Sequence, residues 1–281
     1  MSMHDSSTGV CRVAAIQMVS GPEVEANLHA AAELLTDAAR QGARLAALPE
    51  FFPIMGRADT DKLAVREAFG AGAIQEFLAT TARRLGIWIV GGSLPLAAGV
   101  PHKVRNACLV YDSAGKVAAR YDKIHLFGFT NGSERYAEAN TIEPGDQVVA
   151  LDSPFGRIGL SVCYDIRFPE LYRSMGAVDI ITIPSAFTAV TGKAHWETLI
   201  RARAIENLAY VLAPAQGGRH ANGRETHGHT MIVDPWGEIV ARVETGPGVA
   251  LADVDRGRIA RVRASLPALE HRALPCALIK D

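Results

Sequence analysis

An internal repeat restricts the fold of this chain more than any other feature of its sequence. The segment YDSAGKVAAR at residues 111–120 matches VDPWGEIVAR at residues 233–242 in its turn residues and in the apolar residues around the turn. Each copy predicts a β-hairpin. Before each hairpin the chain follows one order of strand, helix, strand, helix and strand, and both ALPEFF and TIPSAF end a strand in proline. The sequence therefore predicts two similar halves.

Hydrophobic periodicity places the elements of each half. The first half is expected to have strands at 13–17, 45–48 and 87–90, helices between 24 and 42 and between 74 and 86, and a hairpin at 104–121. The second half is expected to have strands at 158–162, 180–183 and 210–213, helices from 169 and from 196 to 208, and a hairpin at 230–243. A strand at 249–254 and a helix to about 265 follow, and residues 123–147 show no period and are expected to form a loop.

The two halves together predict an α/β fold. Each half can form one sheet with helices on a single face, and packing the two bare faces together gives a four-layer α-β-β-α sandwich with two pseudo-repeated halves. The alternative is a single doubly wound sheet. No linker or change of composition separates the halves, so we expect one domain over residues 11–272, a flexible N-terminus at 1–10 and a tail at 273–281.

The composition excludes several classes of function. The net charge of −1 gives no basic footprint for nucleic acid or for an anionic membrane. The polar N-terminus does not resemble a signal peptide, and no apolar run reaches the ~18 residues of a membrane span. The four cysteines are far apart in the sequence, which favours reduced thiols in the cytoplasm over disulfides.

The stretch RIGLSVCYDIRFPE at residues 157–170 predicts a reactive cysteine. A buried strand delivers Cys163 onto a sharp turn, and a short helix begins near Pro169. On such a turn the thiol is exposed, and the following backbone N–H groups point toward whatever the thiol attacks. The alternative is a buried cysteine with a structural role only.

Two charged residues are expected to join this cysteine. Glu50 and Lys123, like Cys163, directly follow predicted strands, and open α/β sheets place their sites at the carboxyl ends of strands. A carboxylate, an ammonium and a thiol supply a base, a charge stabiliser and a nucleophile. Taken singly, Glu50 and Lys123 could equally be solvated surface residues.

Three motifs in this order resemble the nitrilase, or carbon–nitrogen hydrolase, superfamily. They are LPEFF around Glu50, YDKIHLF around Lys123 and SVCYDIRFPE around Cys163, and the resemblance extends from about Arg12 to about Arg272. It implies a Glu–Lys–Cys triad, no cofactor, the four-layer sandwich and a homo-oligomer, such as a dimer or tetramer. It also implies a second glutamate in YAEANTIEPG, for which Glu138 is our choice and Glu134 and Glu143 are alternatives.

The segments at residues 184–207 and 218–237 resemble the branch of amidases that act on deaminated glutathione. This implies a cysteine-dependent amidase that cleaves a small-molecule amide of a 2-oxo dicarboxylic acid through a thioester. The alternatives within the superfamily are an ω-amidase that acts on α-ketoglutaramate and another amidase or carbamoylase. From other classes, an acyltransferase with the same thioester and a non-catalytic scaffold are also possible.

Four further residues are candidates for the substrate pocket. The N–H of Tyr164 is placed to stabilise an oxyanion, and Arg167 could bind a substrate carboxylate through its planar guanidinium. Alternatively, Arg167 forms an ion pair with Asp165 or Glu170. Phe187 and Thr188, with Trp196, could line the pocket, although core packing would also explain the aromatic residues.

The histidines could offer a metal site instead. His227 and His229 would share one strand face, and His220 is near in sequence. A zinc site would need a third ligand and a supporting shell, which the spacing does not supply. We therefore expect neither metal nor cofactor.

Overall fold

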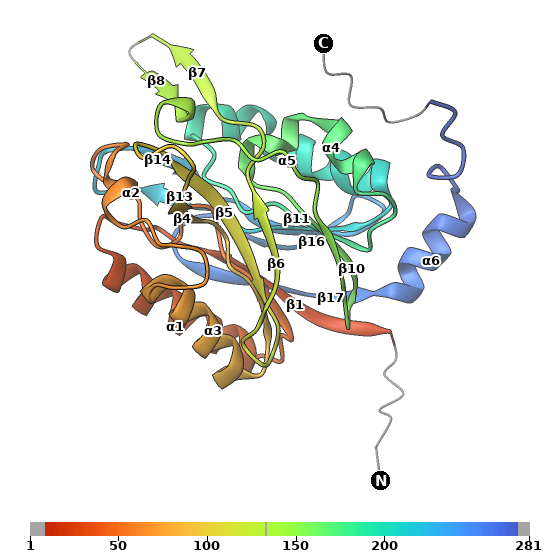
Figure 1. Cartoon of the computed structure of the whole chain (residues 1–281). Helices are drawn as coiled ribbons and strands as arrows, with labels where there is room; N and C mark the ends of the chain where they lie inside the picture. The colour runs from red at the N-terminus through yellow and green to blue at the C-terminus, as the bar shows by residue number, and fades with distance from the viewer. Residues whose placement is uncertain (1–8, 133, 275–281) are drawn as a thin grey trace.

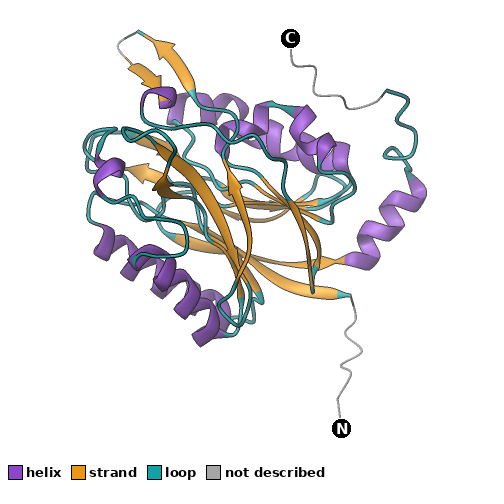
Figure 2. Ribbon diagram, viewed as in Figure 1, coloured by secondary structure: helices purple, strands orange, loops and turns teal. Residues whose placement is uncertain are grey.

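The computed structural model describes residues 9–132 and 134–274. Two β-sheets pack face to face, and helices cover the outer side of each, so the layers lie in the order α-β-β-α (Figure 1). Figure 2 shows the strands between two groups of helices. The predicted sandwich is confirmed, and the doubly wound single sheet is wrong. Of the terminal segments expected at 1–10 and 273–281, only residues 9, 10, 273 and 274 are described.

The first sheet has seven strands. β1, β2 and β3 are parallel, β17 pairs antiparallel with β1, and β5 pairs antiparallel with β3, β4 and β6. The bounds are Val10–Gln17 (β1), Leu45–Ala47 (β2), Trp88–Val90 (β3), Leu94–Ala97 (β4), Val104–Tyr111 (β5), Val117–Asp122 (β6) and Gly248–Asp255 (β17).

The second sheet has six strands in the order β16-β15-β12-β11-β10-β9. Here β10, β11 and β12 are parallel, and β9, β15 and β16 are antiparallel to their neighbours. The bounds are Ala150–Ser153 (β9), Gly156–Leu160 (β10), Ile180–Thr182 (β11), Tyr210–Ala213 (β12), Thr230–Val233 (β15) and Ile239–Val243 (β16).

The repeat seen in the sequence is a repeat of topology. The series β1, β2, β3, β5 and β6 has two parallel pairings followed by two antiparallel ones, and β10, β11, β12, β15 and β16 repeat that series. The two hairpins identified by their matching turns are β5–β6 and β15–β16. The two pseudo-repeated halves are therefore confirmed.

Alternation of side chains along β1 explains the layering. Val13 and Ala15 belong to the core that also contains the strands of the second sheet, whereas Ile16 packs with Leu35 of the outer helix α1. Successive strand residues point to opposite faces, so one apolar run serves two layers. The central strand β2 is buried along its whole length, as expected for a parallel strand covered on both faces.

The helices that the sequence predicted begin and end close to where its signals place them, with one exception. α3 ends at Gly86, whose φ of 66° is the left-handed conformation that glycine accepts readily. α5 begins earlier than the apolar stripe from Trp196 predicts, because the Thr188 side chain caps its first turn. The helix bounds are Val24–Arg40 (α1), Asp61–Ala64 (α2), Ala73–Leu85 (α3), Pro169–Ser174 (α4), Ala189–Asn207 (α5) and Arg256–Ser265 (α6).

The structure corrects the prediction that residues 123–147 form a loop. It contains the hairpin of β7 (Gly128–Asn131) and β8 (Glu134–Ala137), followed by the 3₁₀ turn η1 (Glu138–Asn140). These two strands pair only with each other and do not join the main sheets, so no buried face gives their sequence a period. A second small hairpin, β13 (Gly217–Arg219) with β14 (Glu225–His227), is of the same kind.

Within residues 9–132 and 134–274, none of the helices combines the length and the apolar character that a membrane crossing needs. The longest, α5, carries charged residues along its length and packs against strands of the second sheet.

Candidate active site

Cys163 lies where β10 gives way to a tight 3₁₀ turn, η2 (Cys163–Arg167). Its φ of 50° is left-handed, a conformation that costs a non-glycine residue free energy and concentrates at functional sites. The strain is held in place because the Cys163 backbone N–H donates to the carbonyl of Pro184 at 2.9 Å. The residue is 7% exposed, so the predicted sharp turn is present, but the thiol is mostly enclosed.

Lys123 and Glu50 form a buried ion pair beside this turn. Nζ of Lys123 lies 2.8 Å from Oε1 of Glu50, and the two side chains are 0% and 1% exposed. Asn106 on β5 holds both residues. Its side-chain NH₂ donates to the same Glu50 oxygen at 2.9 Å, and its backbone carbonyl accepts from the Lys123 backbone N–H at 3.0 Å. Both donors use Oε1, so Oε2 of Glu50 accepts from neither of them.

Glu138 in η1 is the second glutamate of the site. Its Oε2 lies 2.7 Å from Nζ of Lys123 and also accepts from the Phe127 backbone N–H at 2.7 Å. Glu143, one alternative, instead pairs with Arg105 at 2.6 Å. The side chain of the other alternative, Glu134, lies outside the described part of the structure. The geometry thus brings Glu138, and not Glu143, to Lys123.

Burial and charge shift the pKa of all three central groups. Burial raises the pKa of Glu50; Lys123 opposes this shift and Glu138 adds to it. Burial disfavours the ammonium of Lys123, but Glu138 and Glu50 outweigh it and hold its pKa well above the usual value. Burial also raises the pKa of the Cys163 thiol well above its usual range, and Glu50 adds to this effect. At neutral pH the thiol therefore keeps its proton until a base removes it.

Asp165 joins the segment that carries Lys123 to the turn that carries Cys163. Its Oδ2 accepts from the Tyr121 hydroxyl at 2.7 Å and from the Val162 N–H at 2.8 Å. Its Oδ1 accepts from the backbone N–H of His125 at 3.0 Å and lies 2.7 Å from the His125 ring nitrogen Nδ1. A fully buried carboxylate with this many donors is rigidly placed, so it fixes the two segments against each other.

A small pocket opens onto the cysteine. It is lined by Phe127, Cys163, Tyr164, Arg167, Ala186, Phe187, Thr188 and Thr191. All four candidate pocket residues from the sequence, namely Tyr164, Arg167, Phe187 and Thr188, are therefore on its wall. Phe187 also packs against the buried ring of Trp196, with 4.9 Å between ring centres, so it serves both the pocket and the core.

Arg167 does not pair with Asp165, whose oxygens are taken by Tyr121, His125 and Val162. Its guanidinium carbon lies 5.8 Å from the ring centre of Tyr164 and 5.5 Å from that of Phe187, and its Nη2 is 3.2 Å from Nδ1 of His195. The cation is thus held on aromatic rings at the edge of the pocket, where a carboxylate could reach it.

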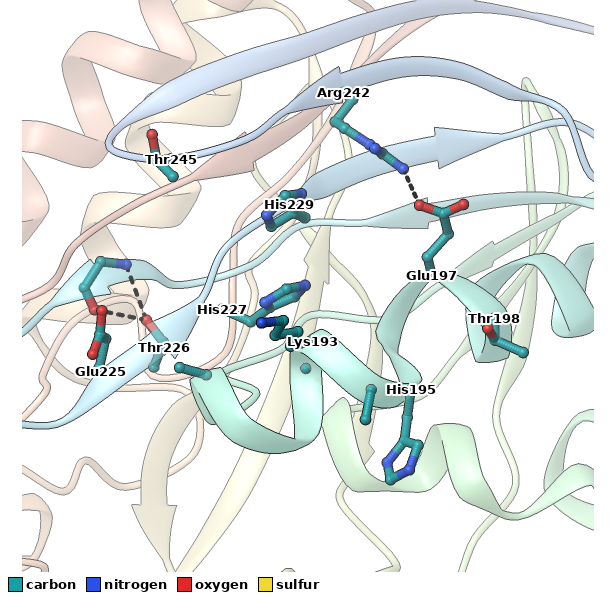
Figure 3. Close-up of a pocket in the computed structure, with 14 residues that line it drawn as sticks. Lys193, His195, Glu197, Thr198, Glu225, Thr226, His227, His229, Arg242 and Thr245 are labelled. Carbon is teal, nitrogen blue, oxygen red and sulfur yellow. Dashed lines mark hydrogen bonds and ion pairs between the residues drawn. The ribbon is translucent and has the colours of Figure 1, made fainter.

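A second, larger pocket is lined by the first turns of α5 and by β14 (Figure 3). His227 and His229 stack there with ring centres 4.3 Å apart, and Arg242 pairs with Glu197. Gly192 allows this packing, because a Cβ atom there would lie 2.2 Å from the Cβ of His227.

His220 does not join the stacked pair. Its ring nitrogens contact the carbonyl of Ser20 at 2.8 Å and the hydroxyl of Thr226 at 2.7 Å. Among the described residues, no group of three or more His, Cys, Asp or Glu side chains is arranged to hold a metal ion. The alternative of a metal site at these histidines therefore gains no support from the geometry.

Reasoning from the sequence missed Asn106 and Asp165. Asn106 is one polar residue inside an apolar strand, VRNACLVY, which was a usable signal because a buried amide needs partners. Asp165 lies within the cysteine motif, but its partner His125 is 40 positions away in the sequence, and nothing in the local pattern connects the two.

Comparison with known proteins places these residues in a family context. The sequence model described as carbon-nitrogen hydrolase matches residues 12–264. A deaminated glutathione amidase from Synechocystis sp. is 45% identical to this chain over 265 residues, which cover 92% of this chain and 97% of the relative.

Solved structures agree with this relationship. The NitFhit protein of C. elegans superimposes with a TM-score of 0.88 at 37% identity, covering 95% of this chain and 66% of that chain. A mutant of the amidase from Nesterenkonia sp. AN1, described as showing Michael addition of acrylamide at the active site cysteine, gives a TM-score of 0.76 at 27% identity, covering 92% of this chain and 98% of that chain.

Proposed function

Because this chain belongs to the carbon-nitrogen hydrolase family of the nitrilase superfamily, and is an amidase of that family, we propose that its substrate is deaminated glutathione. The observation that carries the amide-cleaving chemistry is the buried contact of Glu50 with Lys123 next to the strained Cys163 turn. The similarity to a deaminated glutathione amidase over nearly the whole chain supports the choice of substrate.

We propose that Cys163 is the nucleophile and Glu50 the general base. Glu50 takes the proton of the thiol as Sγ forms a bond to the amide carbon, and the carbonyl electrons move onto oxygen. The raised pKa of Glu50 makes it a better proton acceptor than an exposed glutamate. Nζ of Lys123 and the backbone N–H of Tyr164 stabilise the oxyanion, an effect typically worth ~3–4 kcal/mol per donor removed.

The intermediate then collapses to a thioester. The C–N bond breaks, and protonated Glu50 gives its proton to the departing amine nitrogen. Water next loses a proton to Glu50 and attacks the thioester carbon. The C–S bond breaks, the thiolate recovers the proton from Glu50, and the acid leaves. Glu138 assists by holding the ammonium of Lys123 in place through both steps.

The acyl end of the substrate gives Arg167 its role. Both deaminated glutathione and α-ketoglutaramate carry a 2-oxoglutaryl group with a free carboxylate. Arg167 lies on the pocket wall with Cys163, four positions after it in the chain, and a guanidinium binds a carboxylate through two parallel hydrogen bonds. Phe187 and Thr188 complete this side of the pocket.

The test of this function is a comparison of two amides on one preparation of enzyme. Release of Cys-Gly from deaminated glutathione and of ammonia from α-ketoglutaramate gives two values of kcat/KM. We expect the higher value for deaminated glutathione. A clear preference for α-ketoglutaramate would make the chain an ω-amidase. Turnover of only a nitrile or an N-carbamoyl amino acid would overturn the substrate and leave the triad standing.

We also propose that the enzyme is a homo-oligomer, at least a dimer. Large apolar side chains are exposed on α5 and on the neighbouring hairpin, where Ile205 is 45% exposed, Trp236 54% and Val240 44%. Ile205 packs next to Gly237, the neighbour of Trp236 in the hairpin turn, so these apolar residues of α5 and of the turn lie close together. Light scattering at micromolar concentration should give at least twice the chain mass of 30.0 kDa, and that single mass throughout would contradict the proposal.

We propose that the enzyme works in the cytoplasm. Cys11, Cys108 and Cys163 are free thiols, and Cys276 lies outside the described residues. A thiol nucleophile must stay reduced, which a cytoplasmic compartment ensures. Cell fractionation with an antibody to the chain tests this, and recovery of the protein in an oxidising compartment would contradict it.

A further inference from the structure

Lys62 of α2 lies at the rim of the catalytic site. Its Nζ is 3.1 Å from the hydroxyl of Thr141, which follows η1, and 5.4 Å from the ring centre of Phe51, the neighbour of Glu50. Phe51 shares an apolar cluster with Ala186, a wall residue of the cysteine pocket. The ammonium of Lys62 therefore contacts residues that border the catalytic site.

Arg224 comes to this rim from the turn before β14. Its guanidinium carbon lies 4.9 Å from the ring centre of Tyr136, and its Nη1 is 3.9 Å from the sulfur of Met55. The segments that carry the two cations are joined, because the side chain of Asn222 donates to the carbonyl of Gly56 at 2.6 Å. Figure 1 shows α2 and β14 at the same end of the molecule.

Neither cation has an anionic partner in the part of the chain that the structure describes. Among the described residues, neither Lys62 nor Arg224 has a carboxylate within ion-pair distance. Burial lowers the pKa of Lys62; Asp59 and Glu138 oppose this shift, and the positive charges of Arg224 and Lys123 add to it. Two partly buried cations that destabilise each other form a site that an anion would stabilise.

This cationic pair is separated from Arg167 by aromatic side chains. Between ring centres, Phe127 lies 5.3 Å from Tyr164 and 5.5 Å from Tyr136. The guanidinium of Arg167 lies over the ring of Tyr164, and that of Arg224 lies over the ring of Tyr136. Phe127 also lines the pocket of Cys163. Cys163 thus has Arg167 on its own pocket wall, and Lys62 and Arg224 lie beyond the row of rings formed by Tyr164, Phe127 and Tyr136.

We propose that Lys62 and Arg224 bind the carboxylate of the leaving amine, so that the enzyme selects amides whose leaving group carries a negative charge at its far end. This rests on the proposed function, in which Arg167 binds the carboxylate of the acyl group. The Cys-Gly leaving group of deaminated glutathione ends in a carboxylate, and the ammonia released from α-ketoglutaramate has none. The second site therefore distinguishes two substrates that form the same thioester.

Two amides that differ in one charge test the proposal on the wild-type enzyme. The first is deaminated glutathione, and the second is the same molecule with its terminal carboxylate converted to a carboxamide. We expect kcat/KM to be at least about tenfold higher for the carboxylate, since hydrogen bonds to a charged group are stronger than those to a neutral one. Equal values for the two amides would overturn the proposal while leaving the proposed function intact. Turnover of neither amide would overturn both.

Variants then identify the residues. Lys62→Met and Arg224→Gln should each reduce the preference for the carboxylate severalfold, and the double variant should bring the ratio of kcat/KM values close to one. Arg219→Gln is the matched control, because Arg219 is an exposed arginine of the same small hairpin. The control should keep the wild-type ratio. Retention of the preference in the double variant, or its loss in the control, would overturn the assignment to Lys62 and Arg224.

Discussion

The ammonium of Lys123 lies 2.7 Å from the carboxylate of Glu138, as close as it lies to Glu50 at 2.8 Å. One buried cation is therefore shared by two carboxylates, and the group carries one net negative charge. Burial raises the pKa of Glu50, Lys123 opposes this shift and the charge of Glu138 adds to it, and the two carboxylates keep Lys123 protonated. Glu138 thus affects the base and the oxyanion stabiliser at the same time.

Glu138→Gln should lower kcat at least about tenfold and shift the acid limb of the pH profile. The base must be ionised to act, so kcat/KM rises with pH through the raised pKa of Glu50. Removing the charge of Glu138 lowers that pKa, and the acid limb should move to lower pH. Measurement of kcat/KM from pH 4 to 8 checks this. Glu143→Gln is the control, because Glu143 pairs with Arg105 instead. An acid limb that moved to higher pH in Glu138→Gln would contradict the argument.

Cys163→Ala should fold and produce no acid. The substitution removes one small, enclosed side chain and keeps the hydrogen bond from the Cys163 backbone to Pro184. Intact-mass measurement of the wild type mixed with substrate should show a transient increase equal to the acyl group, and the variant should show none. Normal turnover by the alanine variant would exclude Cys163 as the nucleophile.

The stability of the fold should depend on pH through His227. Burial, His229 and Arg242 lower its pKa from 6.5 to about 4. Between these values the unfolded chain binds a proton that the folded chain excludes, so stability is lost as pH falls from about 6.5 toward 4. His227 is partly exposed, so we expect about 1 kcal/mol after allowing for solvent screening. Urea unfolding at pH 7.5 and pH 5 should therefore show a smaller loss for His227→Gln than for the wild type. The exposed His102→Gln is the control, and an equal loss in all three proteins would exclude this role of His227.

The parts of the fold that the sequence predicted are those with a buried face. Leu45–Ala47 and Ile180–Thr182 are short apolar runs inside their sheets, and the paired turns of the two hairpins revealed the repeat. The hairpin of Gly128–Asn131 with Glu134–Ala137 was missed because its strands pair only with each other and their residues follow no period. Helix α2 has one turn, too short for periodicity to register.

The candidate site was also predictable only where its residues lie at the ends of strands with a buried face. Glu50, Lys123 and Cys163 were predictable because each ends a strand whose position was clear. The choice between Glu138 and Glu143 depended on how η1 turns, which no pattern fixes. Lys62 comes from the one-turn helix α2 and Arg224 from the turn before β14, and only the folded chain shows that these two segments are joined.

Asp165 is expected to position Lys123 against Cys163, although it touches neither substrate nor thiol in the proposed mechanism. Tyr121→Phe removes one donor to Asp165 and the weak acceptor of the Ile124 N–H at 3.4 Å, and it leaves the contacts of Asp165 with Val162 and His125 in place. It loosens the segment that carries Lys123, so kcat should fall about tenfold while KM changes little, because substrate binding does not involve this contact. Tyr172→Phe is the control: it removes the hydrogen bond that another buried tyrosine hydroxyl donates, here to the hydroxyl of Ser161 at 3.0 Å. Both variants should lose about 1 kcal/mol of unfolding free energy. If Asp165 has only a structural role, the two variants will have equal kcat at equal loss of stability. If it positions Lys123 against Cys163, Tyr121→Phe will lose activity well beyond its control.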